Sequence, residues 1–174
     1  MSKSYLGFGI ASLLAMGSMF ISIAAEGQQV PEQLRPPANA EMVARVHAKG
    51  DQIYTCKEDI KGYGWTLKAP DAQLFDKDGK SFGRHFDGPT WEAKDGSRVM
   101  GKAAANVSPD PDSVPWLLVK VMKHKGNGVL SRVTTIQRIE TKGGKAPASG
   151  CDEPHAGQEI RVAYTADYVF WAAK

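Results

Sequence analysis

Residues that could do chemistry are densest between His85 and Ser97. His85 and Asp87 stand two positions apart, so on a strand both point to one face, where an aspartate can orient an imidazole. Glu92 adds a second carboxylate, and neighbouring carboxylates can separate their pKa values for acid and base work. The spacing makes His85, Asp87 and Glu92 candidate catalytic residues of a cell-envelope hydrolase.

The same block also suits binding without catalysis. Trp91 lies in a turn-rich stretch of mixed polarity, where an indole ring can stack on a ligand. Loops held by a rigid scaffold often carry binding residues, and the loop from Ser108 to Ser113 is a further candidate. The residues predicted to face a ligand are His85, Trp91, Glu92 and Asp95.

The residues of this block can also have purely structural roles. Asp87-Gly88 and Asp95-Gly96 are favourable turn sequences in their own right, whatever else they do. Trp91 and the other tryptophans (Trp65, Trp116 and Trp171) can equally be core residues of a small β domain. No motif in the chain specifies a reaction, so the sequence leans away from an enzyme.

Metal and cofactor sites are not expected. The remaining histidines, His47, His124 and His155, stand alone in the sequence, and no pair of them has a zinc-ligand spacing. Nucleotide-binding glycine motifs are absent, and Gly143-Gly144 between two lysines fits a flexible turn.

Apolar residues mostly alternate with polar ones, which is typical of strands. Short alternating runs are separated by turn signals such as Gly50-Asp51, Ala69-Pro70-Asp71 and Gly126-Asn127-Gly128. The pattern predicts an all-β fold, an antiparallel sandwich or barrel of roughly nine to ten strands. Helix competes only over residues 38–48, which contain several good helix formers.

The start of the chain predicts export. Lys3 precedes an apolar stretch that ends in small residues at Ala24 and Ala25, as in a cleaved signal peptide. We therefore divide the chain into a signal peptide (1–25), an extended Pro-rich lead-in (26–40) and one β-rich domain (41–174), with an uncleaved anchor as the alternative. Export to the periplasm or the extracellular space makes a structural disulfide between Cys56 and Cys151 the expected state of the two thiols.

Charge and hydropathy restrict the partners. The formal net charge is +3 over 174 residues, and basic residues are spread along the sequence, which argues against a nucleic-acid partner. No apolar run after the signal peptide is long enough to span a membrane. The expected partner is a small molecule, a glycan or a protein.

Several blocks of the sequence resemble the Domain of Unknown Function 3455 family. The resemblance implies an exported single-domain protein of bacteria or fungi, supports the pairing of the two cysteines, and carries no activity. The blocks that carry it are Ile53-Tyr54-Thr55-Cys56, Ala69-Pro70, Leu74-Phe75, Gly88-Pro89-Thr90-Trp91-Glu92, Asp95-Gly96-Ser97, Trp116-Leu117-Leu118, Ile136-Gln137-Arg138, Thr141-Lys142-Gly143-Gly144, Cys151 and Tyr164-Thr165-Ala166-Asp167-Tyr168.

A Tyr-x-Cys strand followed by Asp-Gly hairpins is also similar to small periplasmic inhibitors of c-type lysozyme, which are antiparallel barrels. That likeness concerns fold and does not license a function. Taken together, the sequence predicts an exported envelope or extracellular binding module. The alternatives are the hydrolase described above and a purely structural or stress protein.

Overall fold

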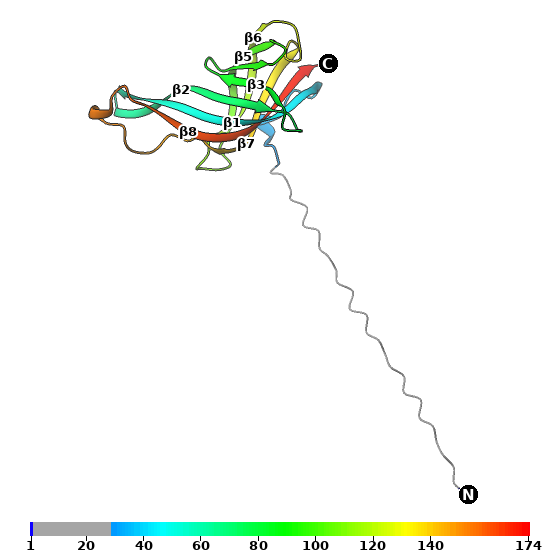
Figure 1. Ribbon diagram of the computed structural model, residues 1–174, viewed down its shortest axis with the longest axis horizontal. Coiled ribbons are helices and arrows are strands. Elements are labelled where there is room, and N and C mark those ends of the chain that lie inside the picture. The colour runs from blue at the N-terminus through cyan, green and yellow to red at the C-terminus, as the bar shows by residue number, and fades with distance from the viewer. Residues whose placement is uncertain (2–28) are drawn as a thin grey trace.

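The structure is a computed structural model that describes residue 1 and residues 29–174 of the 174-residue chain. Eight strands follow one another around a closed antiparallel barrel, and the first pairs with the last, so that β1 and β8 run side by side (Figure 1). The predicted all-β antiparallel fold is confirmed, as a barrel rather than a sandwich. The strands are β1 (Ala40–Asp59), β2 (Gly62–Phe75), β3 (Ser81–Phe86), β4 (Thr90–Ala93), β5 (Arg98–Val107), β6 (Trp116–Lys125), β7 (Val133–Gly143) and β8 (Glu159–Ala173).

The prediction of roughly nine to ten strands is wrong, because two predicted breaks lie inside continuous strands. β1 runs through Gly50-Asp51. A Cβ atom on Gly50 would lie 2.2 Å from the carbonyl oxygen of Asp71, so this glycine permits a close approach of two backbones rather than a turn. β2 runs through Pro70, which lacks an N–H group. β2 pairs with β3 only from Ala72 onward, so Pro70 lies where one edge of the strand has no ladder partner.

The inside of the barrel is filled by its own side chains. Trp91, Tyr168 and Phe170 are each at most 2% exposed. They belong to a core cluster with buried members from every strand except β3, whose partly buried Phe82 packs against it. The edge of the Tyr168 ring meets Trp91, with ring centroids 5.5 Å apart. An eight-stranded barrel is just wide enough to be filled in this way.

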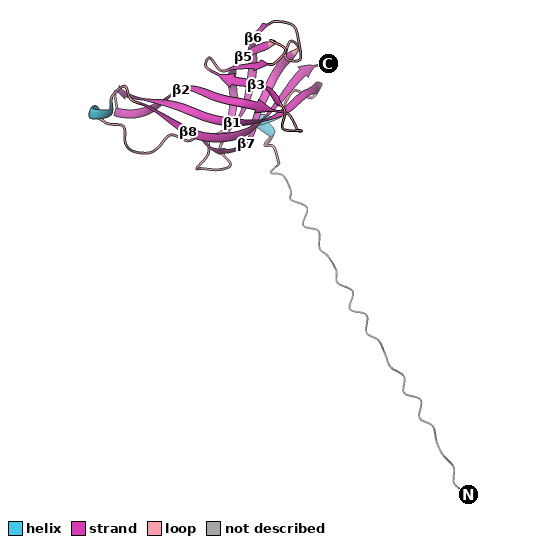
Figure 2. Cartoon of the chain, in the orientation of Figure 1, coloured by secondary structure: helices cyan, strands magenta, loops and turns pink. Residues whose placement is uncertain are grey.

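Three strands, β1, β2 and β8, extend beyond the others as an arm (Figure 1). Cys56 and Cys151 form a disulfide on this arm, with Cα atoms 5.3 Å apart, which confirms the predicted pairing. A short 3-10 helix, η2 (Glu153–His155), lies at the end of the arm (Figure 2). The Cys56 amide donates to Gln158, and its carbonyl accepts from Gly157, so backbone contacts hold the same junction.

The segment before β1 packs on the outside of the barrel. It contains a second 3-10 helix, η1 (Glu32–Leu34), and Leu34 is completely buried against Trp116, Ile139 and Val169. The Gln137 side chain donates to the carbonyl oxygen of Leu34 at 2.6 Å. The predicted signal peptide and the first part of the lead-in, through residue 28, lie outside the described residues apart from residue 1. Over the described part of the chain, no helix is long and apolar enough to cross a membrane.

Candidate functional site

Two of the four residues predicted to bind a ligand lie inside the barrel. His85 and Trp91 are cross-strand partners on β3 and β4 and are 3% and 2% exposed. The His85 Nδ1 atom lies 2.9 Å from the carbonyl oxygen of Thr90, to which an Nδ1–H group donates. Burial lowers the pKa of His85 to about 3, helped by the nearby positive charge of Arg138. The imidazole is therefore neutral at physiological pH and contacts protein groups.

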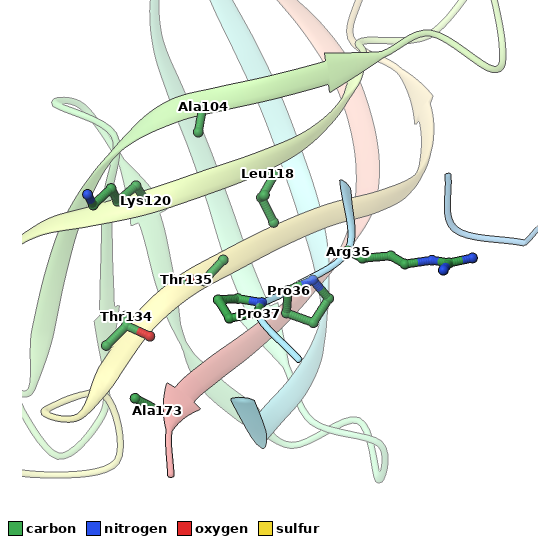
Figure 3. A pocket seen from close by; sticks show the side chains of 9 residues that line it. All are labelled: Arg35, Pro36, Pro37, Ala104, Leu118, Lys120, Thr134, Thr135 and Ala173. Carbon is green, nitrogen blue, oxygen red and sulfur yellow. The ribbon is translucent and has the colours of Figure 1, made fainter. Parts of the chain in front are cut away.

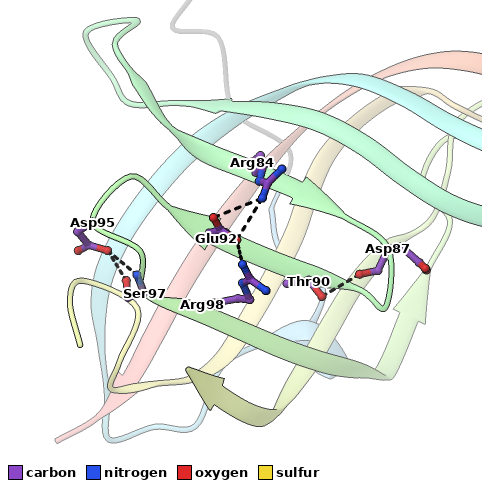
Figure 4. A network of polar contacts seen from close by, with 7 residues as sticks. All are labelled: Arg84, Asp87, Thr90, Glu92, Asp95, Ser97 and Arg98. Atoms are coloured by element: carbon purple, nitrogen blue, oxygen red, sulfur yellow. Dashed lines mark hydrogen bonds and ion pairs between the residues drawn. The ribbon is translucent and has the colours of Figure 1, made fainter. Parts of the chain in front are cut away.

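Glu92 lies on the opposite face of the same strands. Side chains alternate between the faces of a sheet, so the pair Arg84 and Glu92 points outward while the next pair, His85 and Trp91, points inward. Figure 4 shows Glu92 between the guanidinium groups of Arg84 and Arg98, with Arg84 Nη2 3.4 Å from the carboxylate. This carboxylate is fully engaged as the centre of a surface ion-pair cluster.

Asp87 and Asp95 lie in turns. Asp87 accepts a 2.6 Å hydrogen bond from the amide of Gly88, and its carbonyl accepts from the Thr90 hydroxyl. Asp95 accepts from the hydroxyl and the amide of Ser97, at 2.6 and 2.9 Å, and from the amide of Val129 at 2.7 Å. These bonds, with the Ser97 hydroxyl first, lower the pKa of Asp95. Asp95 thus connects the β4–β5 turn to the segment between β6 and β7.

The fold consequently separates the three catalytic candidates. His85 is interior, Glu92 is on the outer face, and the Asp87 side chain is at the far end of the hairpin from Glu92 (Figure 4). General acid–base chemistry needs its groups within hydrogen-bond reach of one reacting atom. Glu92 and Asp95 lie at the surface, but their carboxylates already have partners within the protein, and His85 and Trp91 could meet a ligand only if the barrel opened. A binding role for this block stays a prediction.

A groove on the outer surface of the barrel has room for a small ligand. Its cavity volume is about 520 Å³, and it lies between the lead-in segment and strands β5 to β8 (Figure 3). Pro36 and Pro37 face Leu118 and Thr135 across it, and Lys120 stands at one end, while the Arg35 side chain is directed away from the other lining residues (Figure 3). Ala104, Thr134 and Ala173 complete the lining. The groove is therefore largely apolar, with a cation at one end.

The lysine of the groove has an unfavourable neighbour. Lys120 on β6 lies directly opposite Lys102 on β5, and both are exposed. Like charges in directly opposed positions of an antiparallel pair destabilise the sheet. No carboxylate among the described residues forms an ion pair with either lysine, in contrast to the paired Arg84 and Arg132. The two ammonium groups are available to an anion from outside the chain.

A second, polar cleft of about 370 Å³ lies against β1, β7 and β8. His47 on β1 is opposite Asp167 on β8, and its Nδ1 atom is 2.9 Å from a carboxylate oxygen. The other oxygen of Asp167 is 2.7 Å from Arg45, whose guanidinium also contacts Glu140 at 3.0 Å. An imidazole oriented by an aspartate can act as a base. The Thr141 hydroxyl in the lining donates to Val114, so it is not free to act as a nucleophile.

Glu140 has the only positive φ of a non-glycine residue in the described range, at 53°. It lies where the β7–β8 register shifts between Ile139 and Lys142, as expected of a β-bulge. Left-handed backbone is costly for a side chain with a Cβ atom, and glycine is the usual residue there. The bulge directs the Glu140 carboxylate to Arg45.

The lysine pair was not predicted from the sequence. Lys102 and Lys120 are separated by the Ser108–Ser113 loop, and two register shifts lie within the β5–β6 ladder. Counting residues outward from the connecting loop therefore does not predict that these two lysines are opposite each other. The exposed lysines are spread along the sequence, and only the ladder brings them together.

Within the described residues, no group of three or more His, Cys, Asp or Glu side chains is placed to hold a metal ion. The comparison with protein families matches residues 36–172 to the family described as "Protein of unknown function (DUF3455)". This match confirms the resemblance found in the sequence blocks. No curated protein and no solved structure matches the chain.

Proposed function

The chain belongs to the DUF3455 family, and from that starting point we propose that it is an exported binding module that holds a small anionic amphiphile in the outer groove. The observation that carries the proposal is the position of Lys120. It lines the end of an apolar groove and lies opposite Lys102, with no ion-pair partner for either lysine among residues 29–174.

The groove offers separate contacts for the two ends of such a ligand. Leu118, Ala104, Ala173 and the two prolines give an apolar surface on which a hydrocarbon chain is removed from water. Lys120 and Lys102 attract a carboxylate or a phosphate at the other end. The volume of about 520 Å³ is within the usual range of small-molecule sites.

A site on the outside suits this barrel because its interior is packed. Val119 and Ile136, which precede or follow groove residues in β6 and β7, are at most 2% exposed and point inward. The neighbouring positions Leu118 and Thr135 point outward and line the groove. The lead-in segment then forms the second wall, fixed by the buried Leu34 and its hydrogen bond from Gln137.

The disulfide supports the exported location. Disulfides persist in oxidising compartments, and one between Cys56 and Cys151 fits a protein of the periplasm or the extracellular space. The signal peptide predicted over residues 1–25 would take the chain there. An envelope location would bring the barrel close to anionic amphiphiles.

Calorimetric titration with laurate, dodecanol and dodecyltrimethylammonium tests the proposal, since these probes share a chain and differ in head-group charge. We expect laurate to bind, with dodecanol weaker and the cation not measurable. The double variant Lys102→Gln/Lys120→Gln should weaken laurate binding by about ten-fold, corresponding to loss of two partly solvated ion pairs. Ala104→Phe, at an exposed position, should fill the groove and abolish binding of both laurate and dodecanol.

The matched control is Lys57→Gln/Lys61→Gln, which removes the same charge from exposed positions near the tip of the arm. It should leave laurate binding unchanged. Equal binding of laurate and the cationic probe would refute the role of the lysines. Laurate binding that survives Ala104→Phe would refute the groove as the site.

A further inference from the structure

Five cationic side chains are gathered on β5 and β6, and we call them the basic stripe: Arg98, Lys102, Lys120, Lys123 and Lys125. All four lysines are exposed, and none has a carboxylate ion-pair partner in the described part of the chain. Arg98 alone is paired, with Glu92. The basic stripe therefore carries four positive charges, unpaired within residues 29–174, on the outer face of β5 and β6.

The register opposes these charges to one another. Arg98 lies opposite Lys125, and Lys102 lies opposite Lys120, so two of the cross-strand pairs in this ladder join like charges. Each such pair destabilises the isolated sheet. An external surface with negative charges would remove this repulsion and gain attraction from each lysine.

Apolar side chains accompany the stripe. Met122 lies between Lys120 and Lys123 at the register shift of the β5–β6 ladder, and its side chain is 60% exposed. Val129, just after β6, is 37% exposed. A surface that combines exposed cations with exposed apolar groups is suited to the boundary between lipid head groups and acyl chains.

A small cavity lies within the stripe. Its volume is about 290 Å³, and it is lined by Arg98, Met100, Lys123, His124 and Lys125. Lys123 and Lys125 are exposed and have no ion-pair partner among the described residues. Their ammonium groups are donors for one phosphate group in the cavity, with Met100 as an apolar wall.

We infer that the basic stripe docks the barrel on an anionic lipid surface, with a phosphate head group in the cavity and Met122 at the acyl boundary. The inference goes beyond ligand capture. Lys102 and Lys120 belong to both the stripe and the proposed ligand site, whereas none of the residues that line the small cavity lines the groove. An acidic polymer would use the lysines but would leave Met122 and Val129 in water. The lipid surface accounts for both sets of side chains.

Co-sedimentation tests the inference with vesicles of phosphatidylcholine alone and of phosphatidylcholine mixed with phosphatidylglycerol. We expect the protein to bind the mixed vesicles and not the neutral ones, and to be released by high salt, which screens exposed charges. Lys123→Gln/Lys125→Gln should weaken binding by roughly ten- to thirty-fold, given the usual attraction of each lysine to an anionic membrane. Met122→Ser should weaken binding without changing its salt dependence.

The control Lys57→Gln/Lys61→Gln carries the same change in net charge on the arm and should bind the mixed vesicles as the parent protein does. An equal loss in this control would overturn the inference, because net charge alone would then explain binding. Preference for soluble heparin or DNA over the vesicles would also overturn it and assign the stripe to a polymer. Laurate titration of Lys123→Gln/Lys125→Gln separates the two proposals: retained laurate binding with lost vesicle binding supports docking independently of the groove.

Discussion

The imidazole ring of His85 stacks on the indole ring of Trp91, with centroids 4.2 Å apart and ring planes inclined by 11°. Tyr168 completes the group in an edge-to-face arrangement, with its ring centroid 5.1 Å from that of His85. Residues chosen from the sequence for chemistry are here a structural unit that fills the barrel.

Trp91→Ala and Glu92→Gln should differ greatly in their effect on stability, although the residues are adjacent. Trp91 is 2% exposed, and removing a buried tryptophan side chain costs about 3–5 kcal/mol. Glu92 forms surface ion pairs, whose loss costs about 1 kcal/mol or less. Urea unfolding of the two variants measures both values. Comparable losses would show that the ring is not part of the core.

Acidification should destabilise the barrel through His85. The pKa of His85 is lowered to about 3 in the folded protein from 6.5, so between these values the unfolded chain binds a proton that the folded protein does not. The free energy of unfolding therefore falls as the pH drops through this window, by at most about 1.4 kcal/mol per pH unit. Urea unfolding between about pH 7 and pH 5 should show a shallower slope for His85→Gln. An identical slope in parent and variant would contradict a buried neutral imidazole.

Glycine and alanine at position 140 should reverse their usual order of stability in a strand. Both substitutions remove the ion pair between Glu140 and Arg45. The φ of 53° favours glycine, whereas alanine keeps the left-handed strain. Glu140→Gly should therefore be more stable than Glu140→Ala by about 1 kcal/mol, measured by thermal unfolding. Greater stability of the alanine variant would place this residue outside the left-handed region.

Removal of the disulfide should weaken the protein without changing its fold. The bond joins residues 95 positions apart, and a loop of this length corresponds to about 4–5 kcal/mol in the chain-entropy treatment. Cys56→Ala/Cys151→Ala should lower the urea midpoint but keep a β-type circular dichroism spectrum, since the β1–β8 ladder covers Ala40 to Thr55 of β1 and the whole of β8. Loss of the β spectrum in water would show that the bond is needed to form the barrel.

The fold class was accessible from the sequence because alternation is a local property. Val46 and Ala48 point inward, and their neighbours Arg45 and His47 point outward, as their order in the chain indicates. The two cysteines were equally informative, because each thiol of a chain with only two cysteines has one possible intramolecular partner. The strand count failed at Gly50, where a glycine that looks like a break is required by the nearby backbone of β2.

The groove and the basic stripe could not be predicted from the alternation of polar and apolar residues. Their residues come from β5, β6, β7, β8 and the lead-in, and the bulges in β5 and β6 shift the register between them. The face on which His85 lies was also ambiguous, because Arg84 and His85 are both polar and only the closed barrel decides which of them is interior.

The closure of the barrel by β1 and β8 places Ala40 opposite Ala173, and the amide of Lys174 donates to Asn39. A short peptide could therefore join these two positions while every strand keeps its neighbours. New ends opened at the Asp76–Lys80 hairpin turn would give a circularly permuted chain with the same ladder. A label or surface tether fused after Lys174 would emerge at the rim where β1 begins and β8 ends, which fixes how the barrel is presented when it is immobilised.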